Sequence, residues 1–218
     1  MSNKYFLSAL LVASLCVGAS SAIAAVTPGP TAYHVEIDTT GMSGDGFLDL
    51  SFIAGQLPAT YASAVLSDFS GVYGAASQAT GDVAGALSNG LTFGNTHSYN
   101  DFLQSITLGG KFGFDIGVGG AFLTSPGTSN TIFAFDLLSA DYTNLGNPSG
   151  NLGEIVLTPV TEGSAAGIST GVYDPALATI TPISAVAPVP EPSAWLTLLS
   201  GLGVMGLVIR RRASTRIG

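Results

Sequence analysis

The sequence predicts an all-β fold for residues 25–187, an antiparallel β-sandwich of jelly-roll-like type. Several short segments alternate apolar and polar residues with a period of two, as half-buried strands do. Clusters of Gly, Asn, Asp and Pro lie between these segments and predict turns. No sustained helical period interrupts this region. Many short strands separated by turn residues are typical of antiparallel sandwiches.

Four segments alternate most clearly, and they are 33–38, 46–54, 111–118 and 131–138. In the second of them, Leu48, Leu50 and Phe52 face one way and Asp49 faces the other. The further strand candidates are 64–69, 86–93, 102–108, 154–157 and 178–185. Turns are expected at 44–46, 109–110 and 146–150, and a short helix is allowed near 60–65 or 175–178.

The N-terminus, residues 1–24, has the pattern of a secretory signal helix for Sec export. Lys4 supplies the positive charge, residues 5–18 are mostly apolar, and Ala22 and Ala24 form a small-x-small cleavage pattern. The single cysteine, Cys16, lies inside this signal. The mature chain therefore has no thiol for a disulfide, a catalytic cysteine or a cysteine-based metal site.

The C-terminus has three parts with distinct physical properties. Prolines in 188–193 favour an extended, solvated segment. The uncharged stretch 194–209 predicts a transmembrane helix of roughly 24 Å, short for a hydrocarbon core of about 30 Å. Arg210, Arg211 and Arg212 follow at once and predict that the tail 210–218 stays in the cytoplasm, with the preceding domain outside.

This order of parts resembles the PEP-CTERM sorting domain of Gram-negative bacteria. The resemblance rests on Val189, Pro190, Glu191, Pro192 and Ser193, followed by the apolar stretch and the three arginines. It implies recognition and cleavage by exosortase, an inner-membrane-anchored intermediate, and delivery to the cell surface or the exopolysaccharide matrix. The chain from residue 33 onward also resembles a β-rich domain family that carries this tail; its activity is undefined, so it implies no catalytic residue.

The charge of the exported domain is strongly negative. Residues 25–187 hold thirteen of the fourteen acidic residues, and Lys111 is their only basic residue, which gives a formal net charge of −12. Such a domain has no basic patch to bind nucleic acid, and its negative charge opposes binding to anionic lipid surfaces. We expect the acids mainly to keep an exported domain soluble, with Ca²⁺ as a weak candidate ligand.

Three motifs that suggest chemistry lack the context that the chemistry needs. Residues 167–171 fit the G-x-S-x-G pattern around Ser169, but no histidine follows them, as a hydrolase triad requires. Residues 201–206 fit G-x-G-x-x-G but lie in the apolar stretch, without the strand that a dinucleotide site needs. His34 on an outward strand face and His97 in a loop are expected to be surface residues. We therefore predict no catalytic residue, no metal ligand and no enzymatic activity.

A binding function is the remaining alternative to a structural or adhesive role in the matrix. Sugar-binding surfaces often use aromatic rings, but the only tryptophan, Trp195, lies in the tail. Four tyrosines could serve instead, although we expect them to be partly buried with hydrated hydroxyls: Tyr61, Tyr73, Tyr99 and Tyr142. The sequence thus predicts a structural or adhesive surface protein, with a polysaccharide- or calcium-binding module as the alternative.

Overall fold

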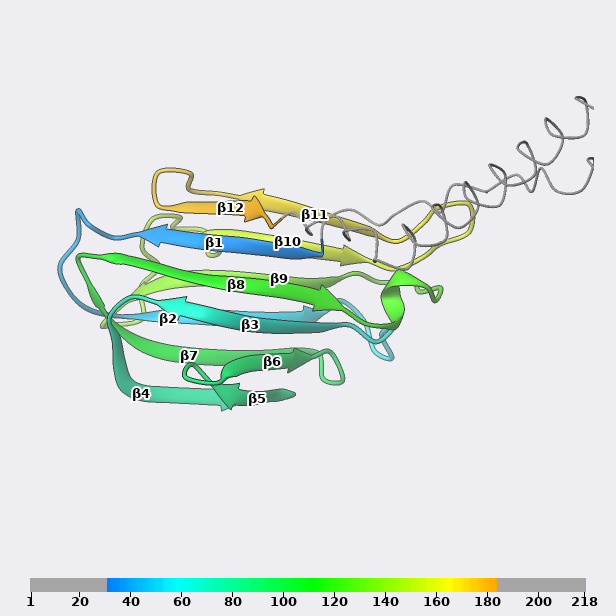
Figure 1. The fold of residues 1–218 in the computed structure, drawn as a ribbon, viewed down its shortest axis with the longest axis horizontal. Coiled ribbons are helices and arrows are strands. Elements are labelled where there is room, and N and C mark those ends of the chain that lie inside the picture. The colour runs from blue at the N-terminus through cyan, green and yellow to red at the C-terminus, as the bar shows by residue number, and fades with distance from the viewer. Residues whose placement is uncertain (1–30, 184–218) are drawn as a thin grey trace, which may run out of the picture.

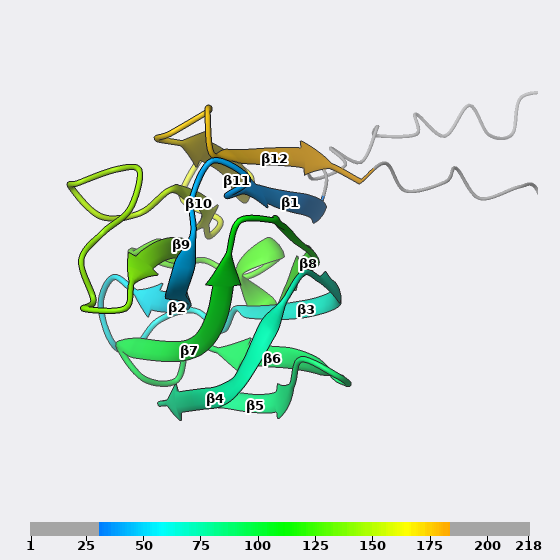
Figure 2. The same cartoon turned by 90° about the vertical axis from the view of Figure 1, so that its left-hand side faces the viewer.

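The computed structural model describes residues 31–183, which form two six-stranded antiparallel sheets that face each other (Figures 1 and 2). The predicted all-β sandwich is confirmed. Within residues 31–183, no helix has the length and apolar character needed to cross a membrane. The predicted signal helix, 1–24, and transmembrane helix, 194–209, lie outside the described residues.

The two sheets have similar sizes, and consecutive strands mostly lie in opposite sheets. Sheet A contains, from edge to edge, β12 (Ala178–Pro182), β1 (Ala32–Asp38), β8 (Lys111–Gly119), β3 (Ser63–Ser70), β6 (Gly90–Gly94) and β5 (Val83–Ala86). Sheet B contains β11 (Gly167–Val172), β10 (Gly153–Thr158), β9 (Thr131–Ser139), β2 (Gly44–Ala54), β7 (Tyr99–Leu108) and β4 (Tyr73–Thr80). A 3₁₀ turn, Ala121–Leu123, follows β8. Figure 2 shows β4 and β5 together at one edge of the sandwich and β11 and β12 at the other.

The core is formed by the inward faces of both sheets and is rich in phenylalanine. Phe114 of sheet A lies with its ring centroid 6.2 Å from those of Phe133 and Phe135 in sheet B. Phe93 of sheet A similarly makes edge-to-face contacts with Phe52 and Phe133 of sheet B. All five of these side chains have no exposed surface. Edge-to-face contacts of this kind hold the two sheets in one relative position.

Buried polar side chains fix the loops where the chain crosses between sheets. The Thr39 hydroxyl donates to the carbonyl of Gly110 and accepts from the backbone N–H groups of Gly109 and Gly110. Asn95 accepts from the N–H of Ala62 and donates to the Thr131 hydroxyl. These bonds satisfy polar groups that would otherwise be costly to bury.

The strand predictions were right where alternation was strong and failed where it was weak. The four most clearly alternating segments form β1, β2, β8 and β9. The predicted strand 86–93 is wrong, because a turn at residues 87–89 separates β5 from β6 and Gly90 has a φ of +88°. Strand β11, which pairs with β10 from Gly167 onward, is not among the predicted strands. No helix forms at 60–65 or 175–178.

Candidate functional site: the outer face of sheet B

The predicted sorting residues lie beyond the part of the chain that the structure describes. They are the motif Val189, Pro190, Glu191, Pro192 and Ser193, the arginines 210–212, and the signal-cleavage residues Ala22 and Ala24. The structure therefore leaves their roles as predictions.

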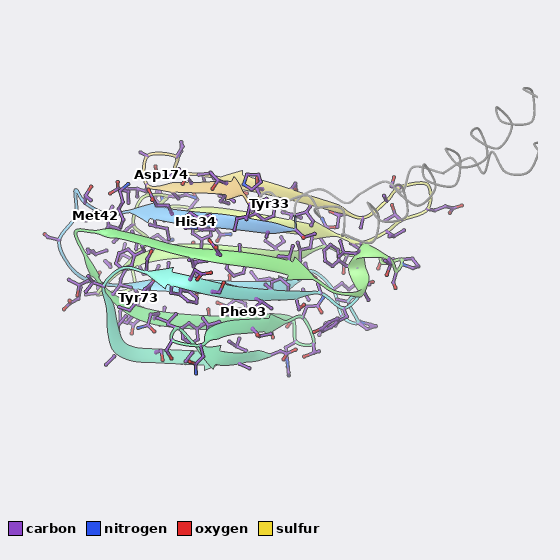
Figure 3. All side chains as sticks on the ribbon, viewed as in Figure 1. Tyr33, His34, Met42, Tyr73, Phe93 and Asp174 are labelled. Carbon is purple, nitrogen blue, oxygen red and sulfur yellow. The ribbon has the colours of Figure 1, made fainter. Side chains whose placement is uncertain are left out.

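The residues of the weaker motifs do not come together. Ser169 lies exposed within strand β11, opposite Val156, rather than on a turn from a strand to a helix. His34 lies on the outer face of sheet A, where its Nδ1 is 2.6 Å from a carboxylate oxygen of Asp115 (Figure 3). His97 lies in the exposed loop between β6 and β7. Within residues 31–183, no three His, Cys, Asp or Glu side chains are grouped to hold a metal ion.

Four carboxylates instead lie on four neighbouring strands of sheet B, and we call them the acidic row. Asp49 on β2 is directly opposite Asp136 on β9. Asp101 on β7 is opposite Ser51 and therefore diagonal to Asp49. Glu154 on β10 is opposite Ala134 and diagonal to Asp136. Like charges on neighbouring strands destabilise a sheet, so this arrangement has a cost.

Asp49 lies at the centre of the acidic row and is the most perturbed group in it. Its Oδ1 atom is inaccessible to solvent and has no hydrogen-bond donor among the described residues. Burial first, and then a hydrogen bond with Asp101 and the charges of Asp101 and Asp136, raise the pKa of Asp49 to about 8. Two ionised carboxylates cannot share a hydrogen bond, since neither has a proton to donate. Burial and the neighbouring carboxylates therefore favour the protonated form of Asp49.

The same environment affects the neighbours of Asp49. Burial and then the charge of Asp101 raise the pKa of Asp136 to about 6. The side-chain amide of Asn151 turns its nitrogen toward Asp136. This nitrogen lies 3.3 Å from each oxygen of the Asp136 carboxylate. Tyr99 donates to Asp101 over 3.2 Å, and burial with the nearby carboxylates raises the pKa of the Tyr99 hydroxyl. Perturbed groups gathered on one face are a recognised mark of a functional surface.

An aromatic pair lies beside the acidic row. The rings of Phe47 and Tyr142 are stacked, with centroids 4.7 Å apart and planes 10° from parallel. Phe47 is on β2, two residues before Asp49, and Tyr142 is in the loop that follows β9. Tyr142 is 61% exposed, so the face of its ring that is turned away from Phe47 is open to solvent. This pair is an aromatic platform next to charged groups.

The other candidate tyrosines differ from one another. Tyr61 and Tyr99 are about half exposed. The ring of Tyr73 packs on Phe69 and Phe112, and its buried hydroxyl has no hydrogen-bond partner among residues 31–183. The expected hydrated hydroxyl is therefore wrong for Tyr73, and burial raises the pKa of this hydroxyl to about 12.

The sequence analysis named Asp49, Tyr99 and Tyr142 but did not bring them together, and it missed Asp101, Asp136 and Phe47 as members of a site. The outward positions of Asp49 and Asp136 were readable from strand alternation. Their neighbours on β7 and in the loop after β9 depend on strand pairing, for which the sequence holds no direct signal.

The fold and this face define an all-β, two-sheet protein with an acidic outer surface. Comparison with known proteins adds information on the C-terminal segment. Residues 188–212 match the family model of the PEP-CTERM protein-sorting motif. No curated protein and no solved structure matches the chain. The chain thus carries a PEP-CTERM protein-sorting motif after its β domain. This motif supports the interpretation that exosortase sorts the protein to the outside of the cell.

Proposed function

We propose that this chain is a surface or exopolysaccharide-matrix protein of a Gram-negative bacterium, with a structural or adhesive and non-enzymatic role. The observation that carries the proposal is the sorting motif at residues 188–212. The last described strand, β12, ends at Pro182, just before that motif. The β domain is then the part that is delivered, and the tail is the part that directs delivery.

The proposed route has three steps. The signal at 1–24 directs Sec export and is removed after Ala24. The helix 194–209 then holds an intermediate in the inner membrane, with Arg210, Arg211 and Arg212 on the cytoplasmic side. Exosortase recognises residues 189–193 and cleaves there, which releases the β domain to the surface.

A polysaccharide-binding module is the second candidate function, and a calcium-binding one is the third. The outer face of sheet B favours polysaccharide, because it combines an exposed aromatic ring with hydrogen-bonding carboxylates. For calcium, we expect at most weak binding, since six to eight oxygen ligands are the usual requirement and residues 31–183 hold no group of three suitable side chains.

Glu191→Ala or Pro192→Ala should block delivery without changing the stability of the β domain. The reason is that these residues follow the last described strand, β12, in the sequence and serve only as the recognition sequence. Cell fractionation of the host should show the variants retained in the inner membrane, while the wild type reaches the surface. Ser164→Ala, in an exposed loop, is the matched control and should be delivered normally.

Two results would contradict this separation of roles. One is normal surface delivery of the Pro192→Ala variant. The other is a lower melting temperature of the β domain in either tail variant, since that would mean the tail contributes to the fold.

A further inference from the structure

A hollow on the outer face of sheet B adjoins the aromatic platform. It has a volume of about 150 Å³ and lies between β4, β7, β2 and the loop after β9. Its lining is apolar at Phe47, Leu103 and Tyr142 and polar at Ser77 and Gln78. A second hollow of about 390 Å³ shares Phe47 with the first and extends toward Ser105 and Thr107. A flat ring with polar groups at its rim would fit this combination of lining residues.

The loop after β9 holds Tyr142 over this hollow in an unfavourable backbone conformation. The φ of Tyr142 is +60°, which is uncommon for a bulky residue. A turn maintains this conformation. The N–H of Tyr142 donates to the carbonyl of Ser139 over 3.0 Å, and the N–H of Ser139 donates to the carbonyl of Thr143 over 2.9 Å. The Ser139 hydroxyl also bonds Asp141. Backbone strain that persists at a residue with an exposed aromatic ring indicates that the ring has a functional role, such as contact with a ligand.

Carboxyl groups lie near the hollow, and Asp101 supplies negative charge to it. Phe47 and Asp49 are two residues apart on one face of β2, which separates them by about 7 Å along the strand. Leu103 in the hollow is directly opposite Asp49, and Asp101 is two residues along β7 from Leu103. The only basic residue in 31–183, Lys111, is on sheet A and pairs with Glu36. An anionic ligand would be repelled from this face, and a cationic one would be attracted to it.

We propose that this hollow and the adjoining carboxylates bind a polysaccharide whose sugars carry free amino groups. The apolar face of one sugar ring packs on Tyr142, its hydroxyls bond Gln78 and Ser77, and the amino group of a neighbouring sugar faces Asp101. This inference rests on the polysaccharide-binding candidate above, and it names the class of sugar and the residues.

The test is calorimetric titration of the purified full chain in detergent at pH 6. The ligands are a hexamer of β-1,4-linked glucosamine, its N-acetylated counterpart, a hexamer of galacturonic acid, and hexalysine. We expect binding of the glucosamine hexamer that weakens as salt is added. Tyr142→Ala should weaken that binding about tenfold, the size of an aromatic contact. Asp101→Asn should weaken it about fivefold and reduce its salt dependence.

Matched controls separate this site from general effects. Tyr61→Ala removes a tyrosine that is 50% exposed outside the two hollows, and Asp68→Asn removes a charge on sheet A. Both should bind as the wild type does. Circular dichroism of each variant confirms the fold, and normal C-terminal processing in the host shows that sorting is unaffected by the loss of binding.

Several outcomes would overturn the proposal. They are equal binding of the N-acetylated hexamer, equal binding of hexalysine, binding of the galacturonic acid hexamer, or unchanged affinity in a folded Tyr142→Ala variant. The first three would show that the amino sugar is not what the face selects. The last would show that the aromatic platform does not contact the ligand.

Discussion

Replacing Phe114 with Ala is expected to lower the free energy of unfolding by about 4 kcal/mol. The side chain is fully buried in sheet A, and its ring contacts Phe69 in its own sheet and Phe133 and Phe135 in sheet B. Truncation removes a ring that joins the two layers and leaves a cavity that rigid strands can fill only in part. Equilibrium unfolding in guanidinium chloride measures the loss as a lower midpoint.

Two comparisons make this result specific. Phe114→Leu keeps most of the volume and should cost clearly less than Phe114→Ala. Val72→Ala removes an apolar side chain that is 64% exposed, and its effect should stay within about 0.5 kcal/mol. An unfolding midpoint for Phe114→Ala equal to that of Val72→Ala would mean that the sheets do not pack through this ring.

The free energy of unfolding of the domain is expected to fall as the pH rises from 5 to 8, and Asp49→Asn should remove most of this fall. Folding raises the pKa of Asp49 from 3.8 to about 8, because of burial and then Asp101 and Asp136. Between these pH values the folded state holds a proton that the unfolded state has released. The unfolded state therefore gains relative stability as the pH rises. Asp136, with a pKa raised to about 6, acts in the same direction.

Denaturant unfolding of wild type and Asp49→Asn across this pH range checks the prediction. The amide cannot ionise and can still donate to Asp101, so the variant should be more stable than wild type at pH 8. Asp45→Asn, an exposed acid on the same strand, is the control and should leave the pH dependence unchanged. Wild-type stability that rises toward pH 8, or an Asp49→Asn variant with the wild-type slope, would contradict the assigned protonation of Asp49.

The fold was predictable where burial differs between the two faces of a strand. In β2, the buried Leu48, Leu50 and Phe52 alternate with less buried residues, so the sequence carries the period directly. β4 was missed because all its residues after Tyr73 are exposed and most are small. Its hydrogen bonds to β7 create the strand without an apolar period. The short β5 was joined to β6 because the turn at Gly90 was not recognised.

The acidic row and the aromatic platform could not be predicted as units, although several members were noticed. Asp49, Asp101 and Asp136 are dozens of residues apart, and only the pairing of β2 with β7 and β9 places them together. Tyr142 reaches Phe47 through a loop whose path depends on tertiary contacts. The sorting motif is different, since its parts are consecutive in the chain and a sequence pattern contains them completely.

The central claim is that the C-terminal motif is a substrate that is cut when the β domain is delivered. Mass spectrometry of the protein recovered from the surface of its native host tests this claim most directly. We predict a mature C-terminus near Pro190 to Ser193 and an N-terminus just after Ala24. Surface material that retains the sequence from Arg210 to Gly218 would contradict cleavage during sorting.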